Sequence, residues 1–137
     1  HEAIAFAGAI GQPDQHSGEL PCVYVELVGG AIVTPEELDE FCKENVKEPG
    51  ALPKHIEILE ELPKTAVGKV FKPDLRMRAI KRVFSETLDS SGVNASITSV
   101  DDDKKLGLVA NISSNEDDDT INQVLGDFTI PWQRASN

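Results

Sequence analysis

Apolar residues in the first part of this chain fall into two runs separated by a short polar turn. The first run covers residues 2–10 and is ended by Gly11 and Pro13. The second covers residues 20–28. Apolar runs of this length between turn residues predict buried strands. Because so short a turn joins them, we expect the two strands to pair antiparallel.

Helical spacing of apolar residues follows between residues 35 and 47. Thr34 is a good N-cap, Pro35 suits the first helical position, and Glu37 completes a capping box. The expected buried face consists of Leu38, Phe41, Cys42 and Val46. This pattern predicts a helix that packs one face on the strands.

Alternation of apolar and acidic residues predicts a half-buried strand over residues 56–62, which Pro63 ends because proline has no N–H to donate. A strand, a helix and a strand of these lengths form a parallel crossover by default. Ligand contacts in α/β folds commonly lie just beyond such a strand.

The second half of the chain predicts a helix followed by a hairpin. The helix begins at Pro73 and can end at Gly92. Residues 94–100 and 106–112 are expected to be strands, joined by an acidic turn over residues 101–105. The acidic turn does not fit the template of a calcium-binding loop, so we interpret it as solvated.

A last helix is expected over residues 120–128, with acidic residues before its N-terminus, and Trp132 can anchor the tail on the core. The fold class predicted is α/β (α+β). It consists of a small mixed sheet with packed helices, a ββαβ-type core and a C-terminal α-β-β-α extension.

Composition narrows the classes of function. The chain has 137 residues and a net charge of −11, of which −7 falls on residues 85–137. So acidic a chain is not expected to bind nucleic acid, and no apolar run approaches a membrane span. Two cysteines without the spacing of a metal site favour free thiols in a reducing cytoplasm. The start without Met suggests a piece of a longer protein.

The stretch 62–72 is the strongest candidate for chemistry. Lys64 and Lys69 flank a loop of small residues, and Gly68 allows a tight turn before Lys69. A phosphate-binding P-loop is excluded, because the residues at its required glycine and hydroxyl positions are Pro63 and Val70. We expect Lys69 to project a single mobile cation. For Lys64, a solvated surface charge and a supporting role both remain open.

This stretch resembles the closing motif of the adenylate-forming enzymes, which include acyl-CoA synthetases, luciferases and peptide-synthetase adenylation domains. That motif reads roughly P-K-T-x-x-G-K-[IV]-x-[RK]-x-x-L, and the matching residues are Pro63, Lys64, Thr65, Gly68, Lys69, Val70, Lys72 and Leu75. Two upstream segments also resemble the family, residues 11–25 and 34–38. The resemblance covers residues 1 to about 84.

The resemblance implies the C-terminal lid domain of an AMP-dependent acyl-CoA synthetase. Such enzymes join a carboxylic acid to ATP and then pass the acyl group to CoA. The implied lid covers residues 1–90, and residues 91–137 form an acidic extension. ATP and Mg²⁺ would be bound mainly by a large N-terminal domain that is the partner of the lid. Fatty acid metabolism in the cytoplasm is the expected setting, and the lid alone is expected to be inactive.

Site residues carry over from the family motif position by position. Lys69 would be the catalytic lysine that contacts the carboxylate and the adenylate. The loop around it would consist of Lys64, Thr65 and Gly68. Possible CoA phosphate contacts are Lys72 and, beyond the motif, Arg76 and Arg78, for which a solvated helix face is the alternative. No metal ligand is expected in this chain. Residues 50–53 depart from the common family pattern, which puts a CoA-nucleotide contact there in doubt. Lys72 stands where Arg is common in the family, which keeps the charge but not a bidentate hydrogen-bonding group.

Two other functions remain open on the sequence alone. The lid could belong to a ligase that loads the phosphopantetheine arm of a carrier protein. Alternatively, the acidic extension, residues 91–137, could be a protein-interaction module with no part in catalysis.

Overall fold

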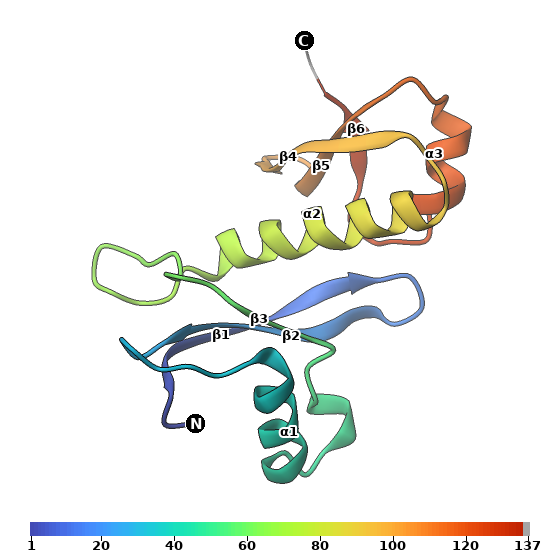
Figure 1. Ribbon diagram of the computed structural model, residues 1–137. Helices are drawn as coiled ribbons and strands as arrows, with labels where there is room; N and C mark the ends of the chain where they lie inside the picture. The colour runs from blue at the N-terminus through green and yellow to red at the C-terminus, as the bar shows by residue number, and fades with distance from the viewer. Residues whose placement is uncertain (136–137) are drawn as a thin grey trace. The chain divides into compact units, whose positions relative to one another are not determined.

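A computed structural model describes residues 1–135 of the chain, which form two three-stranded sheets and three α-helices (Figure 1). The chain divides into two units. Unit 1 consists of residues 1–11 and 20–76, and unit 2 of residues 12–19 together with residues from 77 onward. The predicted α/β (α+β) fold class is confirmed.

The first sheet has the strand order β1-β2-β3, with β1 at Ile4–Asp14, β2 at Gly18–Leu27 and β3 at His55–Ile58. The three predicted strands are therefore present, but β1 continues to Asp14 through Gly11 and Pro13, which were expected to end it. The parallel crossover is also confirmed, since β3 pairs parallel to β2 with Val25 opposite Ile58. β3 ends well before Pro63, which corrects the predicted strand end. Just past the strand, the Leu59 N–H donates to the Val25 carbonyl at 2.9 Å, and the chain then bends at Glu60 and Glu61. After the bend, the Leu62 N–H donates to the Glu26 side chain at 2.9 Å.

Helix α1 covers Pro35–Asn45 and begins as predicted. The Thr34 hydroxyl accepts a hydrogen bond from the Glu37 N–H at 3.2 Å, so one of the orphan donors of the first turn is satisfied. Helix α1 packs against β3, and a short 3₁₀ helix, Pro49–Ala51, follows it. The two cysteines are free thiols, of which Cys22 is buried and Cys42 half-buried.

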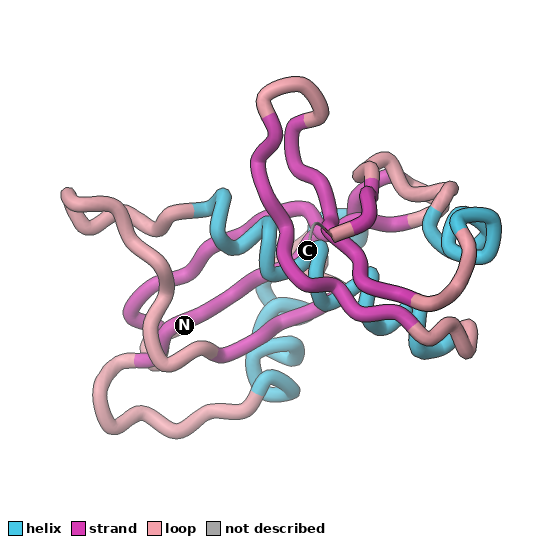
Figure 2. The backbone as a smooth tube through the Cα atoms, turned by 90° about the horizontal axis from the view of Figure 1, so that it is seen from above, coloured by secondary structure: helices cyan, strands magenta, loops and turns pink. Residues whose placement is uncertain are grey.

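Unit 2 contains the second sheet, which has the strand order β4-β5-β6. β4 covers Ala95–Asp103, β5 covers Gly107–Ser114 and β6 covers Trp132–Arg134. The predicted hairpin is confirmed, and β5 also pairs parallel to β6. Figure 2 shows these strands in magenta along the chain trace.

Helix α2, Lys72–Ser90, and helix α3, Asp118–Leu125, differ slightly from the predicted ranges. Helix α3 begins earlier than expected because Asp117, not a later residue, accepts the capping hydrogen bond, from the Thr120 N–H at 2.8 Å. The expected acidic turn at residues 101–105 is also corrected. β4 continues to Asp103, whose side chain accepts from the N–H groups of Lys105 and Leu106 to make the turn.

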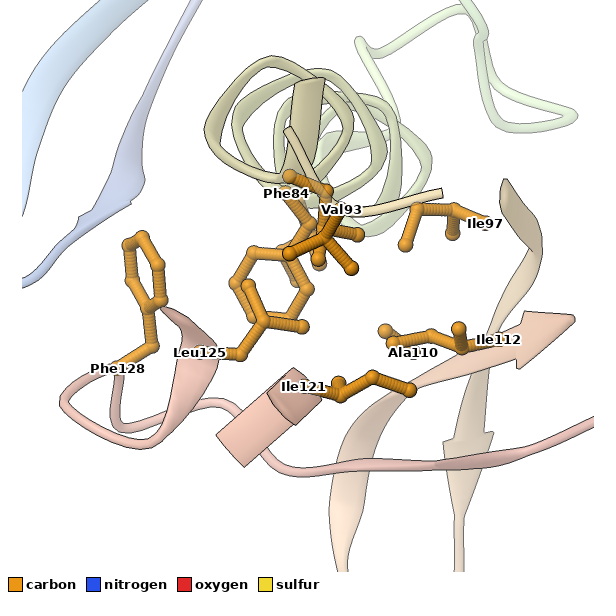
Figure 3. Packing of buried hydrophobic residues seen from close by; sticks show 10 residues of the cluster. Phe84, Val93, Ile97, Ala110, Ile112, Ile121, Leu125 and Phe128 are labelled. Atoms are coloured by element: carbon orange, nitrogen blue, oxygen red, sulfur yellow. The ribbon is translucent and has the colours of Figure 1, made fainter. Parts of the chain in front are cut away.

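The core of unit 2 is a cluster of buried apolar side chains from α2, β4, β5, α3 and the loops that follow α2 and α3 (Figure 3). Its members are Ile80, Phe84, Leu88, Val93, Ile97, Ala110, Ile112, Ile121, Leu125 and Phe128. Trp132 packs against this cluster, as expected, and its ring N–H donates to the Asn122 side chain at 2.8 Å. The extension thus completes its core with residues of α2.

Two remaining expectations concern the C-terminal residues and a membrane-spanning segment. Residues 136–137, the last two of the expected extension, lie outside the described residues. None of the helices formed by residues 1–135 combines the length and the apolar character that a membrane crossing requires.

Candidate functional site

The motif stretch folds as a tight hairpin between β3 and α2, seen as the light-green loop before α2 in Figure 1. Lys64 and Val70 form an antiparallel bridge at its base, and the Phe71 N–H donates to the Pro63 carbonyl at 2.8 Å. The Gly68 N–H donates to the Thr65 carbonyl at 2.9 Å. Gly68 has φ 85°, a conformation that favours glycine. A turn followed by such a residue is a common short hairpin connection.

Thr65 closes the hairpin through two hydrogen bonds to the backbone of Lys69. Its N–H donates to the Lys69 carbonyl at 2.7 Å, and its hydroxyl accepts from the Lys69 N–H at 3.2 Å. The Lys69 backbone is therefore fixed by two hydrogen bonds to one residue. Its side chain is exposed, and within residues 1–135 its ammonium has neither a hydrogen bond nor an ion pair. The hairpin thus presents an exposed cation on a backbone held by hydrogen bonds.

Lys64 differs sharply from Lys69. Its ammonium lies 2.7 Å from Glu26 Oε1 and 4.4 Å from the centroid of the Phe6 ring. The Lys64 and Glu26 side chains are only 19% and 17% exposed. The hydrogen bond from Lys64, with a second from the Leu62 N–H, lowers the pKa of Glu26. Of the two alternatives for Lys64, the structure therefore rules out the solvated surface charge.

The three expected CoA contacts lie on α2 but do not share one side of it. Lys72 and Arg76 are one helical turn apart, so they lie on the same side of the helix. Arg78 is two residues further on, which places it roughly opposite Arg76. All three side chains are exposed. The structure therefore brings Lys72 and Arg76 together with each other, but not with Arg78.

A shallow hollow of about 390 Å³ lies elsewhere in unit 1, between the start of α1 and the start of β3. Three of its lining residues are the carboxylates Glu36, Asp39 and Glu40, against one lysine, Lys54. Carboxylates repel the phosphates of a nucleotide. This hollow is therefore a poor fit for ATP. Among residues 1–135, no group of His, Cys, Asp and Glu side chains has the arrangement of a metal site.

Sequence reasoning missed Glu26 and Phe6, although both contact the hairpin. A carboxylate inside the apolar run of β2 is unusual and could have marked Glu26 as a paired residue. Its partner, 38 positions away along the chain, could not be read from the pattern.

Comparison with known proteins gives matches that include the hairpin. The family model of the AMP-binding enzyme C-terminal domain matches residues 1–69, which is half of the chain and includes the hairpin up to Lys69. Marinolic acid–CoA ligase from Pseudoalteromonas sp. (strain SANK 73390) is 39% identical over 104 residues, 74% of this chain. The match spans only 16% of that ligase.

Solved structures agree with this result. The anthranilate CoA ligase AuaEII in complex with anthranoyl-AMP has a TM-score of 0.53 and 30% identity, covering 61% of this chain and 16% of that one. Apo MatB from Rhodopseudomonas palustris has a TM-score of 0.51 at 24% identity over 56% of this chain and 15% of that one, which shows a shared fold. The chain belongs to the family of AMP-binding enzyme C-terminal domains, as the resemblance of its motifs implied.

Proposed function

We propose that this chain is the lid of an AMP-forming acid–thiol ligase. The reaction converts ATP, a carboxylic acid and CoA into acyl-CoA, AMP and pyrophosphate. Two relatives are CoA ligases by name, and both are much longer than this chain. The extra length would hold the pockets for ATP, Mg²⁺ and the acid. The observation that carries the proposal is the exposed ammonium of Lys69 on a fixed hairpin.

Lys69 would serve the first half-reaction. A carboxylate must approach the α-phosphate of ATP, and two anions repel each other at that distance. A cation between them lowers the repulsion and orients the attacking oxygen. Lysine suits this task, since it carries a compact charge on a long flexible stem. The backbone bonds to Thr65 would keep the root of that stem in place.

The second half-reaction would use a different face of the lid. After the acyl-adenylate forms, the lid would rotate, Lys69 would leave the site, and the thiol would enter. Lys72 and Arg76 are the pair of cations best placed to contact a CoA phosphate together, because they share one side of α2. We do not include Arg78 in that pair.

The proposed boundary places the lid at residues 1–90 and the acidic extension at 91–137. The extension packs its core on Ile80, Phe84 and Leu88 of α2. Deleting the extension would expose these side chains, so a truncation would destabilise α2 and a loss of activity could not be assigned to the extension itself. Point substitutions on the surface are therefore the better test of a role for the extension.

The decisive experiment separates the two half-reactions in the longer enzyme that carries this chain. Adenylation is followed by ATP–pyrophosphate exchange, with short, medium and long straight-chain fatty acids and benzoate as candidate acids. Thioester formation is followed from CoA and the pre-formed adenylate of the acid that is accepted. Lys69→Ala should lower adenylation by about 10²-fold or more and leave thioester formation nearly unchanged.

Lys47→Ala is the matched control, since Lys47 is also an exposed lysine of unit 1 but lies just after α1. It should leave both half-reactions unchanged. Equal losses of both half-reactions in Lys69→Ala would refute the role of Lys69. Absence of exchange with every acid, in an enzyme that is folded, would refute the proposed reaction for these substrates. Replacing CoA by a carrier protein with its phosphopantetheine arm then tests the other acceptor.

A further inference from the structure

The Lys69 hairpin is attached to the sheet at its base and free at its tip. On the incoming strand, Glu26 Oε1 accepts from both the Leu62 N–H, at 2.9 Å, and the Lys64 ammonium, at 2.7 Å. The same ammonium lies over the Phe6 ring of β1. At the tip, by contrast, Val67 is 81% exposed. The Glu26 carboxylate on β2 therefore binds the chain at two residues, Leu62 and Lys64, where it enters the hairpin.

The outgoing strand is attached by packing. A Cβ atom placed on Gly8 of β1 would lie 3.0 Å from Val70 Cγ1 and 2.5 Å from Leu75 Cδ1. Glycine at this position therefore lets the residue after Lys69 pack directly on the backbone of β1. Val70 is also the bridge partner of Lys64, so the ionic and apolar attachments meet across the base of the hairpin.

We infer that Glu26, acting through Lys64, is a positioning residue for Lys69. This inference rests on the proposed function of Lys69. Glu26 does two things in this arrangement. It fixes the base of the hairpin, and it neutralises Lys64, so that Lys69 is the hairpin cation left to act on the substrate.

Position matters here because the reach of Lys69 is set by where its backbone lies. A displacement of about 1 Å in a catalytic group can cost 10²-fold in rate. Releasing Lys64 removes one attachment and leaves the packing of Val70 on Gly8, so the loss should be smaller. We expect adenylation to fall by roughly 10-fold when Lys64 is replaced by Met.

The first experiment needs no substrate. In the 137-residue chain, ¹⁵N relaxation measures the order parameters of Gly68 and Lys69. Lys64→Met should lower both below the wild-type values, and Lys64→Arg, which keeps the cation, should restore them. Lys43→Met is the control, because it breaks the exposed Lys43–Asp39 pair, whose atoms are 3.0 Å apart, elsewhere in unit 1. Unchanged order parameters in Lys64→Met would overturn the inference.

The second experiment is a double-mutant cycle in the longer enzyme, with ATP–pyrophosphate exchange as the readout. Lys64→Met and Glu26→Gln should each lower kcat for adenylation, with little change in the KM for ATP and in thioester formation. In the Lys69→Ala background, the same substitutions should change adenylation by less than about 2-fold. A purely structural role would instead lower both half-reactions, in both backgrounds alike.

The cycle also separates the inference from the proposal on which it rests. If Lys69→Ala leaves adenylation intact, the proposed role of Lys69 fails. If Lys69→Ala lowers adenylation but Lys64→Met does not, only the positioning role of Glu26 and Lys64 fails.

Discussion

Phe84 offers the sharpest test of the packing in unit 2. It is fully buried at the centre of the cluster, and its ring lies 4.8 Å from the Phe128 ring, centroid to centroid, at an interplanar angle of 45° (Figure 3). Other members of the cluster come from separate elements, among them Ile97 of β4 and Ile121 of α3. Phe84→Ala would thus leave a cavity that rigid neighbours on several sides cannot fill.

The expected loss in the free energy of unfolding is about 3–5 kcal/mol, the range for truncating a buried Phe. About 0.5–1.5 kcal/mol of this belongs to the aromatic pair with Phe128. Domains are stable by only about 5–15 kcal/mol, so the substitution removes at least about a fifth of the total.

Urea unfolding followed by Trp132 fluorescence measures this loss in unit 2 alone. Trp132 is the single tryptophan of the chain and packs against the cluster. With a slope of about 1–3 kcal/mol per molar urea, the midpoint should fall by at least about 1 M. Phe71→Ala is the matched control, because Phe71 undergoes the same chemical change but is 39% exposed and belongs to unit 1.

A midpoint shift for Phe84→Ala no larger than that for Phe71→Ala would refute the reasoning. It would mean that the cluster does not close around Phe84. An unchanged fluorescence spectrum in the folded state, together with a large midpoint shift, would support a local cavity without rearrangement of β6.

Two further predictions concern polar groups of unit 2. Hydrogen bonds from the Thr120 side chain and then from its N–H lower the pKa of Asp117. The carboxylate therefore stabilises the fold above its unfolded pKa of about 4, and this stabilisation is lost as the pH falls through the folded pKa. Asp117→Asn keeps the helix cap, so the urea midpoint of this variant should fall less steeply than that of the wild type between pH 5 and pH 2. Asn111 is a buried amide that hydrogen-bonds to side chains on β4 and β6. Asn111→Leu should therefore lower the free energy of unfolding by about 1–3 kcal/mol. Asn115→Leu, at an exposed position, should have little effect on the urea midpoint.

Local rules predicted most of the fold. Helix α1 begins where Thr34, Pro35 and Glu37 indicated, because a cap is decided by neighbours in sequence. β6 was missed, since three residues carry too little periodicity to predict a strand. It forms only because β5 offers it a parallel edge. The early end of β3 was also missed, because apolar and acidic residues continue past the bend at Glu60 and Glu61.

The candidate site was predicted in part. The tight turn at Gly68 and the exposed side chain of Lys69 agree with the expectation from a glycine before a lysine. The contrast between Lys64 and Lys69 could not be predicted, because the two residues have similar neighbours in sequence. What separates them is a carboxylate on β2 and an aromatic ring on β1, both distant along the chain. The catalytic role of Lys69 stays a prediction.

The composition of unit 2 has a consequence for how the chain is made. Its first segment, residues 12–19, is synthesised before the rest of the unit, and the Gln15 side chain donates to the carbonyl of Val124 at 2.8 Å. Its last strand, β6, is synthesised after every other strand of the unit. Unit 1, by contrast, is fully synthesised at residue 76. Unit 2 should therefore mature only after β6 has left the ribosome, and until then the β5 edge that β6 covers is the surface that a chaperone would meet on the nascent chain.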